Sequence, residues 1–194
     1  YVLQNTPNNK THTQYETIFD NKVYKGTFIL NKSLKFIPML LTNEVINILN
    51  KILSKTKNKL EIQLQSRISS SKKNSMSAKK NRQFKYKNVH NYSIKTDTYN
   101  YRWSKKKHPN HHTPKIVMNF KGGYKYFKPI IAEKNIGVTD NTMFVTINNK
   151  PKLLQFLKSD LIKFILKITQ FNYGSNAKNE FHILNLISIP PIKY

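Results

Sequence analysis

Residues 151–170 read PKLLQFLKSDLIKFILKITQ, and this stretch decides the fold class more clearly than any other part of the chain. Its apolar side chains recur at the three- and four-residue spacing that one face of a helix requires. These side chains are Leu153, Leu154, Leu157, Leu161, Phe164, Ile165 and Ile168. Pro151 stands at a position that the first helical turn tolerates. We therefore predict a helix over 151–170, with Gly174 as its stop signal.

A second helix is predicted over 43–55. Thr42 has the residue type of an N-cap, and Glu44 follows in the first turn, where a carboxylate interacts favourably with the helix dipole. One apolar face is then formed by Val45, Ile48, Leu49, Ile52 and Leu53.

Strand signals flank both helices. Runs rich in β-branched and aromatic residues, bounded by turn residues, predict short strands at 23–30, 115–120, 124–127, 142–147 and 181–189. We interpret Gly26 as a bulge, Gly122-Gly123 as a hairpin turn and Pro190-Pro191 as the end of the last strand. Two helices and several short strands predict an α+β fold with a small mixed or antiparallel sheet.

The chain is also divided by composition. Residues 1–22 are polar without a period, which predicts a linker or N-terminal extension. Residues 23–194 are expected to form a single α+β nucleic-acid-binding domain, interrupted by a basic insertion at 57–113. Between Lys55 and Asn91 no apolar period is visible, so we expect this segment to be mobile until a negatively charged partner orders it.

The charge balance is strongly positive. The 194 residues include 34 Lys and Arg against 9 Asp and Glu, giving a net charge of +25, and no cysteine. The absence of cysteine excludes a disulfide scaffold, a zinc ribbon and a thiol nucleophile. Residues 63–132 alone hold 17 basic residues and one acid, Asp97, hence +16. This concentration favours a polyanionic partner, although an A·T-rich coding sequence and a solvated lysine surface are the alternatives.

Motifs for catalysis are missing from the sequence. It has no glycine-rich phosphate loop, no paired carboxylates and no nucleophile elbow. Pro190-Pro191 lacks the neighbours of an amino-methyltransferase loop, since Ile189 precedes it and Ile192 follows it. Three histidines, His108, His111 and His112, have no acidic residue nearby to complete a metal site, so we expect them to be solvated or to contact phosphate. No apolar run reaches the length of a membrane span. We expect no catalytic centre, metal, cofactor or membrane contact in this chain.

Basic and aromatic residues alternate in the middle of the chain, a pattern typical of nucleic-acid binding. Lysines would contact phosphates, and Arg102 and Trp103 would approach bases. The alternative for each aromatic residue is burial of its ring against the core. The candidate binding residues are Arg67, Lys72, Lys73, Lys79, Lys80, Arg82, Lys85, Lys87, Arg102, Trp103, Lys105, Lys106, Lys107 and Lys115.

From Trp103 onward the motifs follow a characteristic order. They are PKIV at 114–117, GG at 122–123, IGVTDN at 136–141, a strand at 143–147, LLQFLKSDL at 153–161 and NLISIP at 185–190. Over roughly residues 100–192, this order resembles the target-recognition region of Eco57I-like adenine-specific DNA methyltransferases, a restriction–modification group also found in large DNA viruses. The resemblance implies a recognition domain that holds DNA opposite a catalytic domain, which would bind S-adenosylmethionine and flip out an adenine. The catalytic motifs are then expected upstream of Tyr1 or on another chain, unless the enzyme has been lost.

The leading hypothesis is thus a DNA-binding target-recognition domain, in the cytoplasm or in a virion. One alternative is a structural RNA-binding protein of an organellar ribosome, which would be mitochondrial. Another is a viral structural protein that lies against the packaged genome.

Overall fold

The structure, a computed structural model, describes residues 12–29, 36–53, 59–64, 75–146, 150–170 and 181–187. It contains helices together with antiparallel and mixed sheets, which confirms the predicted α+β class. The chain divides into two compact units, residues 1–55 and 56–194. The first helix therefore belongs with the N-terminal hairpin rather than with the remainder of the chain.

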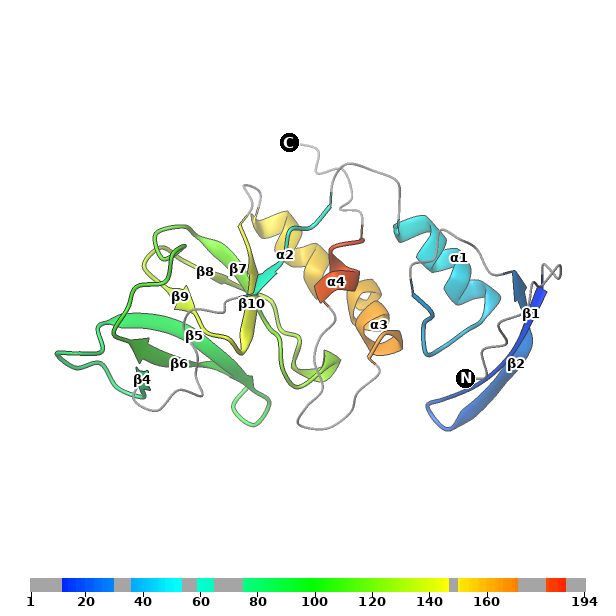
Figure 1. The fold of residues 1–194 in the computed structure, drawn as a ribbon, viewed down its shortest axis with the longest axis horizontal. Coiled ribbons are helices and arrows are strands. Elements are labelled where there is room, and N and C mark those ends of the chain that lie inside the picture. Colours follow the sequence, from blue (N-terminus) through cyan, green and yellow to red (C-terminus); the bar gives the residue numbers. More distant parts are fainter. Residues whose placement is uncertain are drawn as a thin grey trace, which may run out of the picture. The chain divides into compact units, whose positions relative to one another are not determined.

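The first unit contains an antiparallel hairpin of β1 (His12–Phe19) and β2 (Lys22–Ile29) (Figure 1). Asp20 and Asn21 form its two-residue turn, with φ angles of 51° and 61°. Two consecutive positive φ angles are typical of a type I′ turn, whose twist matches that of the paired strands. The prediction of a linker over residues 1–22 is therefore wrong for β1, because pairing with β2 makes a strand of a mostly polar segment.

The strand predicted at 23–30 is confirmed as β2, but Gly26 is not a bulge. The register of β1 and β2 runs without interruption, and Gly26 pairs with Tyr15. A Cβ atom at Gly26 would lie 2.7 Å from the Tyr15 hydroxyl oxygen. The glycine therefore leaves room for the tyrosine ring of the neighbouring strand.

Helix α1 (Asn43–Ile52) confirms the predicted helix and its cap. The Thr42 hydroxyl accepts a hydrogen bond from the Val45 backbone nitrogen at 3.3 Å. Val45 and Leu49 are buried, as the apolar face predicts.

The second unit contains two four-stranded sheets (Figure 1). The strand order of one sheet is β3 (Gln63–Leu64), β10 (Thr142–Val145), β7 (Lys115–Asn119) and β8 (Ile130–Ala132). The order of the other is β4 (Met76–Ser77), β6 (Thr98–Ser104), β5 (Tyr86–Ser93) and β9 (Gly137–Val138). Neighbouring strands are antiparallel, except that β5 and β9 are parallel. Strands β7 and β10 confirm the predictions at 115–120 and 142–147.

One apolar cluster joins the two sheets. It draws residues from β5 and β9 on one side and from β7, β8 and β10 on the other, namely Val89, Val117, Ala132, Val138 and Phe144. Every residue of β7 and β10 is buried. The two sheets of this unit therefore share one core, and strands β7 and β10 each contribute a run of three apolar residues to it.

The basic insertion predicted at 57–113 is largely structured within the described residues. Strands β5 and β6 form a seven-pair hairpin inside it, with an irregularity between Val89 and Asn91. The expectation of a segment without order up to Asn91 is therefore wrong for residues 75–91. Most of the serine-rich run at 69–75 lies outside the described residues.

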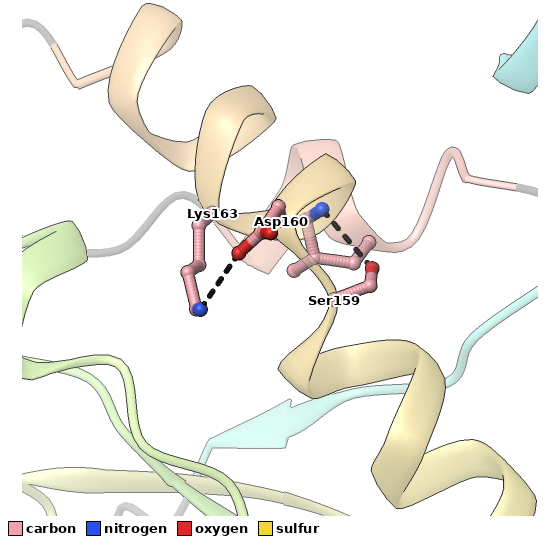
Figure 2. Close-up of polar contacts among 4 residues, drawn as sticks. Ser159, Asp160 and Lys163 are labelled. Carbon is pink, nitrogen blue, oxygen red and sulfur yellow. Dashed lines mark hydrogen bonds and ion pairs between the residues drawn. The ribbon is translucent and has the colours of Figure 1, made fainter.

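The helix predicted over 151–170 is two helices, α2 (Lys150–Lys158) and α3 (Asp160–Ile168). Ser159 separates them because its backbone is extended, with a ψ angle of 155°. Its hydroxyl accepts a hydrogen bond from the Ile162 backbone nitrogen at 3.4 Å and so caps α3 (Figure 2). The Ser-Asp pair at 159–160 is an N-terminal signal that the continuous apolar spacing obscured. Gly174 lies outside the described residues.

The chain does not return as a strand directly after Gly122-Gly123. Both glycines have positive φ angles, 96° and 74°, and a short 3-10 helix, η1 (Tyr124–Tyr126), follows. The Gln170 side-chain oxygen accepts from the Tyr124 backbone nitrogen at 2.7 Å, which fixes the start of η1. The returning strand is β8, so the strand predicted at 124–127 is misplaced by several residues.

The strand predicted at 181–189 is wrong where the structure describes it, because α4 (Phe181–Leu184) is helical. Asn185 then pairs with the backbone of Ile62, accepting from its nitrogen at 2.8 Å and donating to its oxygen at 3.2 Å. A short apolar run does not distinguish a helix from a strand. Pro190-Pro191 lies outside the described residues. Within the described ranges, no helix has the length and apolar character to cross a membrane.

Candidate nucleic-acid interface

Three aromatic rings on or beside β6 each carry a lysine ammonium over the ring. The distances from Nζ to the ring centroid are 4.1 Å for Lys87 and Tyr101, 5.1 Å for Lys105 and Phe84, and 5.7 Å for Lys80 and Trp103. We call these six residues the lysine–aromatic surface. Cation–π contacts of this kind attract each ammonium group to the electron-rich face of a ring.

The β5–β6 hairpin positions the centre of this surface. Tyr101 and Trp103 alternate along β6, so both side chains lie on one face of the sheet. Lys87 is the cross-strand partner of Trp103 in β5, and Ser77 is its partner in β4. Trp103 is therefore held between two strands, and Lys87 lies on the same face as both rings.

A tight turn positions the remaining residues. The Asn81 side-chain oxygen accepts from the backbone nitrogens of Gln83 and Phe84, each at 2.9 Å. The Lys85 nitrogen then donates to the Ser104 oxygen at 3.1 Å, which joins the turn to the end of β6. This Asx-type turn brings Phe84 next to Lys105.

Most of the predicted binding residues that the structure describes are exposed. The exposed ones are Lys79, Lys80, Arg82, Lys85, Lys105, Lys106 and Lys107, and the half-buried ones are Lys87, Arg102 and Trp103. No acidic side chain of the described residues forms an ion pair with any of these basic residues; the ion pairs of Glu16 with Lys25 and of Asp160 with Lys163 lie elsewhere. Within the described ranges, these basic side chains are therefore not paired with acidic side chains.

The side chains of Arg102 and Trp103 lie on opposite faces of strand β6. Arg102 pairs with Asn88 in β5, and its position in the alternation of β6 places it opposite Tyr101 and Trp103. Burial, followed by the charge of Arg102, lowers the pKa of His90, which lies at the irregularity of β5. The structure thus groups Trp103 with lysines and separates it from Arg102.

Lys115 is a correction to the predicted site. Its side chain is fully buried, and its Nζ donates to the Ile136 oxygen at 2.9 Å. Burial lowers the pKa of Lys115 to about 8. It lies in the fully buried strand β7, so it cannot meet a phosphate at the surface. Three other candidates, Arg67, Lys72 and Lys73, lie outside the described residues.

Two histidines that were expected at the surface are buried. His108 and His111 are 2% and 5% exposed, whereas solvated or phosphate-contacting side chains were expected. The His108 Nδ1 accepts from the Asn110 nitrogen at 3.0 Å, and burial lowers the pKa of His108 to about 4. His112 is exposed. In the described part of the chain, no three His, Asp or Glu side chains converge as a metal would require.

The sequence pointed to the aromatic residues only collectively. The Tyr101 ring packs against the buried cluster that contains Val89, as the core alternative for the aromatic residues predicts, and it also carries Lys87. Phe84 is half-buried and carries Lys105. The feature that the sequence does not show is the lysine over each ring. That feature depends on strand register, which composition does not reveal.

No protein-family model matches the chain, and no curated protein matches it significantly. The resemblance to a methyltransferase recognition region therefore stays a prediction.

Proposed function

We propose that the chain binds single-stranded nucleic acid along the lysine–aromatic surface. The exposed lysines contact phosphates, and Trp103 and Phe84 offer their rings to unstacked bases. The observation that carries the proposal is the presence, in one unit, of three lysine–aromatic pairs and seven exposed basic side chains that form no ion pair with an acid of the described residues.

Lysine suits this task because its ammonium is a compact charge on a flexible stem. A lysine that rests on a ring can move to a phosphate and leave the ring face to a base. Stacking on an aromatic ring tolerates every base, since each base has a π-face. We therefore expect binding with little sequence preference, dominated by the backbone charge.

Single strands are favoured over duplexes by the rings themselves. Paired bases stack on one another and do not present their faces to protein side chains, whereas unpaired bases do. DNA remains the polymer that we propose. A target-recognition domain that accompanies a methyltransferase would instead bind duplex DNA with sequence preference, so tight duplex binding in the test below would favour that role. A structural RNA-binding role in a ribosome is the alternative, and a viral genome-associated role is a third.

The test uses Trp103, which is the only tryptophan of the chain. Its fluorescence is followed during titration with single-stranded DNA, the same sequence as RNA, and the DNA duplex, each of about 12 nucleotides per strand. Stacking of a base on the indole should quench the emission, and the affinity should fall steeply as salt is added.

A pair of variants controls for the reporter. Trp103→Phe keeps an aromatic face, and Trp103→Leu keeps only apolar bulk, so labelled oligonucleotide should bind about 5- to 100-fold more weakly to the leucine variant than to the phenylalanine variant. Unchanged emission with all three polymers at low salt, or an affinity independent of salt, would show that the proposed function is wrong.

A further inference from the structure

A pocket of about 750 Å³ opens beside the β5–β6 hairpin, in the same unit as the lysine–aromatic surface. Tyr92, Tyr99 and Tyr101 line it from the hairpin, and Phe127 and Leu157 line it from the segment before β8 and from α2. The volume lies within the range of sites that enclose small organic ligands. Of the six residues of the lysine–aromatic surface, Tyr101 alone also lines this pocket.

The pocket presents rings rather than hydroxyl groups. The Tyr92 hydroxyl donates to the Asp97 carboxylate, and the Tyr99 hydroxyl donates to the Lys128 backbone oxygen at 2.7 Å. Burial raises the pKa of Tyr99, so this hydroxyl stays protonated. The two rings meet edge to face, with centroids 5.6 Å apart. Phe127 and Leu157 are buried and extend this apolar wall. A flat aromatic group would therefore find apolar and aromatic partners here.

Three lysines surround the pocket: Lys128, Lys158 and Lys163. All three are exposed, and Nζ of Lys128 lies 5.8 Å from the centroid of Tyr92. The lining includes one acid, Asp97, and its carboxylate is already hydrogen-bonded by Tyr92. The positively charged lining therefore complements an anion attached to the aromatic group.

One of the lysines has a replaceable partner. Lys163 reaches Asp160 one turn earlier in α3, at 2.9 Å from Nζ to Oδ1 (Figure 2). The side chains of Lys163 and Asp160 are 53% and 97% exposed, and exposed pairs of this kind contribute little to stability. A phosphate dianion can therefore draw the ammonium away from Asp160 at small cost.

We propose that this pocket binds a nucleotide, with the base against the tyrosine wall and the phosphate among the three lysines. A free phosphate would leave the aromatic wall unused, and an uncharged aromatic ligand would leave the lysines unused. Tyr101 belongs both to the pocket and to the lysine–aromatic surface. The nucleotide can thus be a free molecule or the phosphorylated end of a bound strand.

The experiment measures binding of adenosine monophosphate, adenosine and inorganic phosphate to the full chain by calorimetry. We expect the nucleotide to bind at least about tenfold more tightly than either part, because a charge-assisted contact to phosphate contributes roughly that factor. The double variant Lys128→Gln with Lys158→Gln should weaken nucleotide binding by roughly tenfold and leave adenosine binding unchanged. Its charge-matched control, Lys125→Gln with Lys134→Gln, changes exposed lysines that do not line the pocket.

Equal affinities for adenosine monophosphate and adenosine, or nucleotide binding unaffected by the double variant, would overturn the inference. A 5′-phosphorylated oligonucleotide that competes with adenosine monophosphate would support the site as one for strand ends, and tight nucleotide binding without such competition would support a free nucleotide. The inference is independent of the proposed function, since calorimetry without polymer tests the pocket and Trp103 emission with polymer tests the surface.

Discussion

The three consecutive lysines after β6 provide a quantitative test of the interface. Lys105, Lys106 and Lys107 are exposed and have no acidic partner in the described structure. The segment is held by its backbone, since the Ser104 hydroxyl donates to the Lys106 oxygen at 2.6 Å. Replacing all three with glutamine should therefore remove charge without unfolding the segment.

The expected loss follows from counterion release. Each phosphate contact to a single strand contributes about 0.7 to the slope of log affinity against log salt. If the seven exposed basic residues all contact phosphate, the slope is about −5, and three fewer contacts make it about −3. At about 0.1 M salt the triple variant should then bind roughly 100-fold more weakly, about 3 kcal/mol.

The assay is fluorescence anisotropy of a labelled oligonucleotide at several salt concentrations between about 0.05 and 0.2 M. A control variant, with Lys22, Lys125 and Lys134 changed to glutamine, has the same net charge and changes only exposed lysines outside the interface. If both variants weaken binding equally, net charge alone drives association and no defined surface exists. An unchanged slope in the first variant would refute the phosphate contacts directly.

Three further predictions concern the buried groups and the helix break. Wild-type Lys115 has a pKa of about 8 in the folded chain and 10.5 in the unfolded chain, so its buried charge is removed as the pH rises through that range. The free energy of unfolding, measured with urea, should therefore rise by about 3 kcal/mol between pH 8 and 10.5. Lys115→Met should abolish this rise. His108 has a pKa of about 4 folded and 6.5 unfolded, so the unfolded chain binds more protons there; stability should fall by about 3 kcal/mol from pH 6.5 to 4, and less in His108→Asn. Ser159→Ala should destabilise the protein by about 1 kcal/mol in thermal unfolding, whereas Ser159→Asp should retain the cap of α3.

Local signals in the sequence identified the elements that depend on local physics. Thr42 and the spacing of Val45 and Leu49 are sufficient to define α1, because a helix is specified by residues within a few turns. The buried run of β7 was equally clear, since a strand covered on both sides carries continuous apolar sequence. Ser159 shows the limit of such signals, since its cap was present in the sequence but a continuous apolar face concealed it.

Elements that depend on distant partners could not be found this way. Strand β1 is mostly polar and is a strand only because β2 pairs with it. The burial of Lys115 follows from its place in the central strand β7, whereas lysine as a residue type is expected at the surface. The lysine–aromatic pairs likewise depend on which strands become neighbours, so composition indicated the types of residue involved but not their arrangement.

The lysine–aromatic surface contributes little to the stability of the folded chain. Each exposed cation–π contact contributes about 0.5–1 kcal/mol, so the three pairs together contribute roughly 1.5–3 kcal/mol. Seven exposed basic side chains between Lys79 and Lys107, which form no ion pair among the described residues, repel one another, and this repulsion opposes the compact state. A polyanion that binds only the folded chain would stabilise it by mass action and so offset this repulsion.

We therefore expect the triple glutamine variant to be at least as stable as the wild type in the absence of nucleic acid and to gain less stability when oligonucleotide is added. Thermal unfolding with and without oligonucleotide measures both quantities, and a variant that is destabilised on its own would show that these lysines support the fold rather than a ligand.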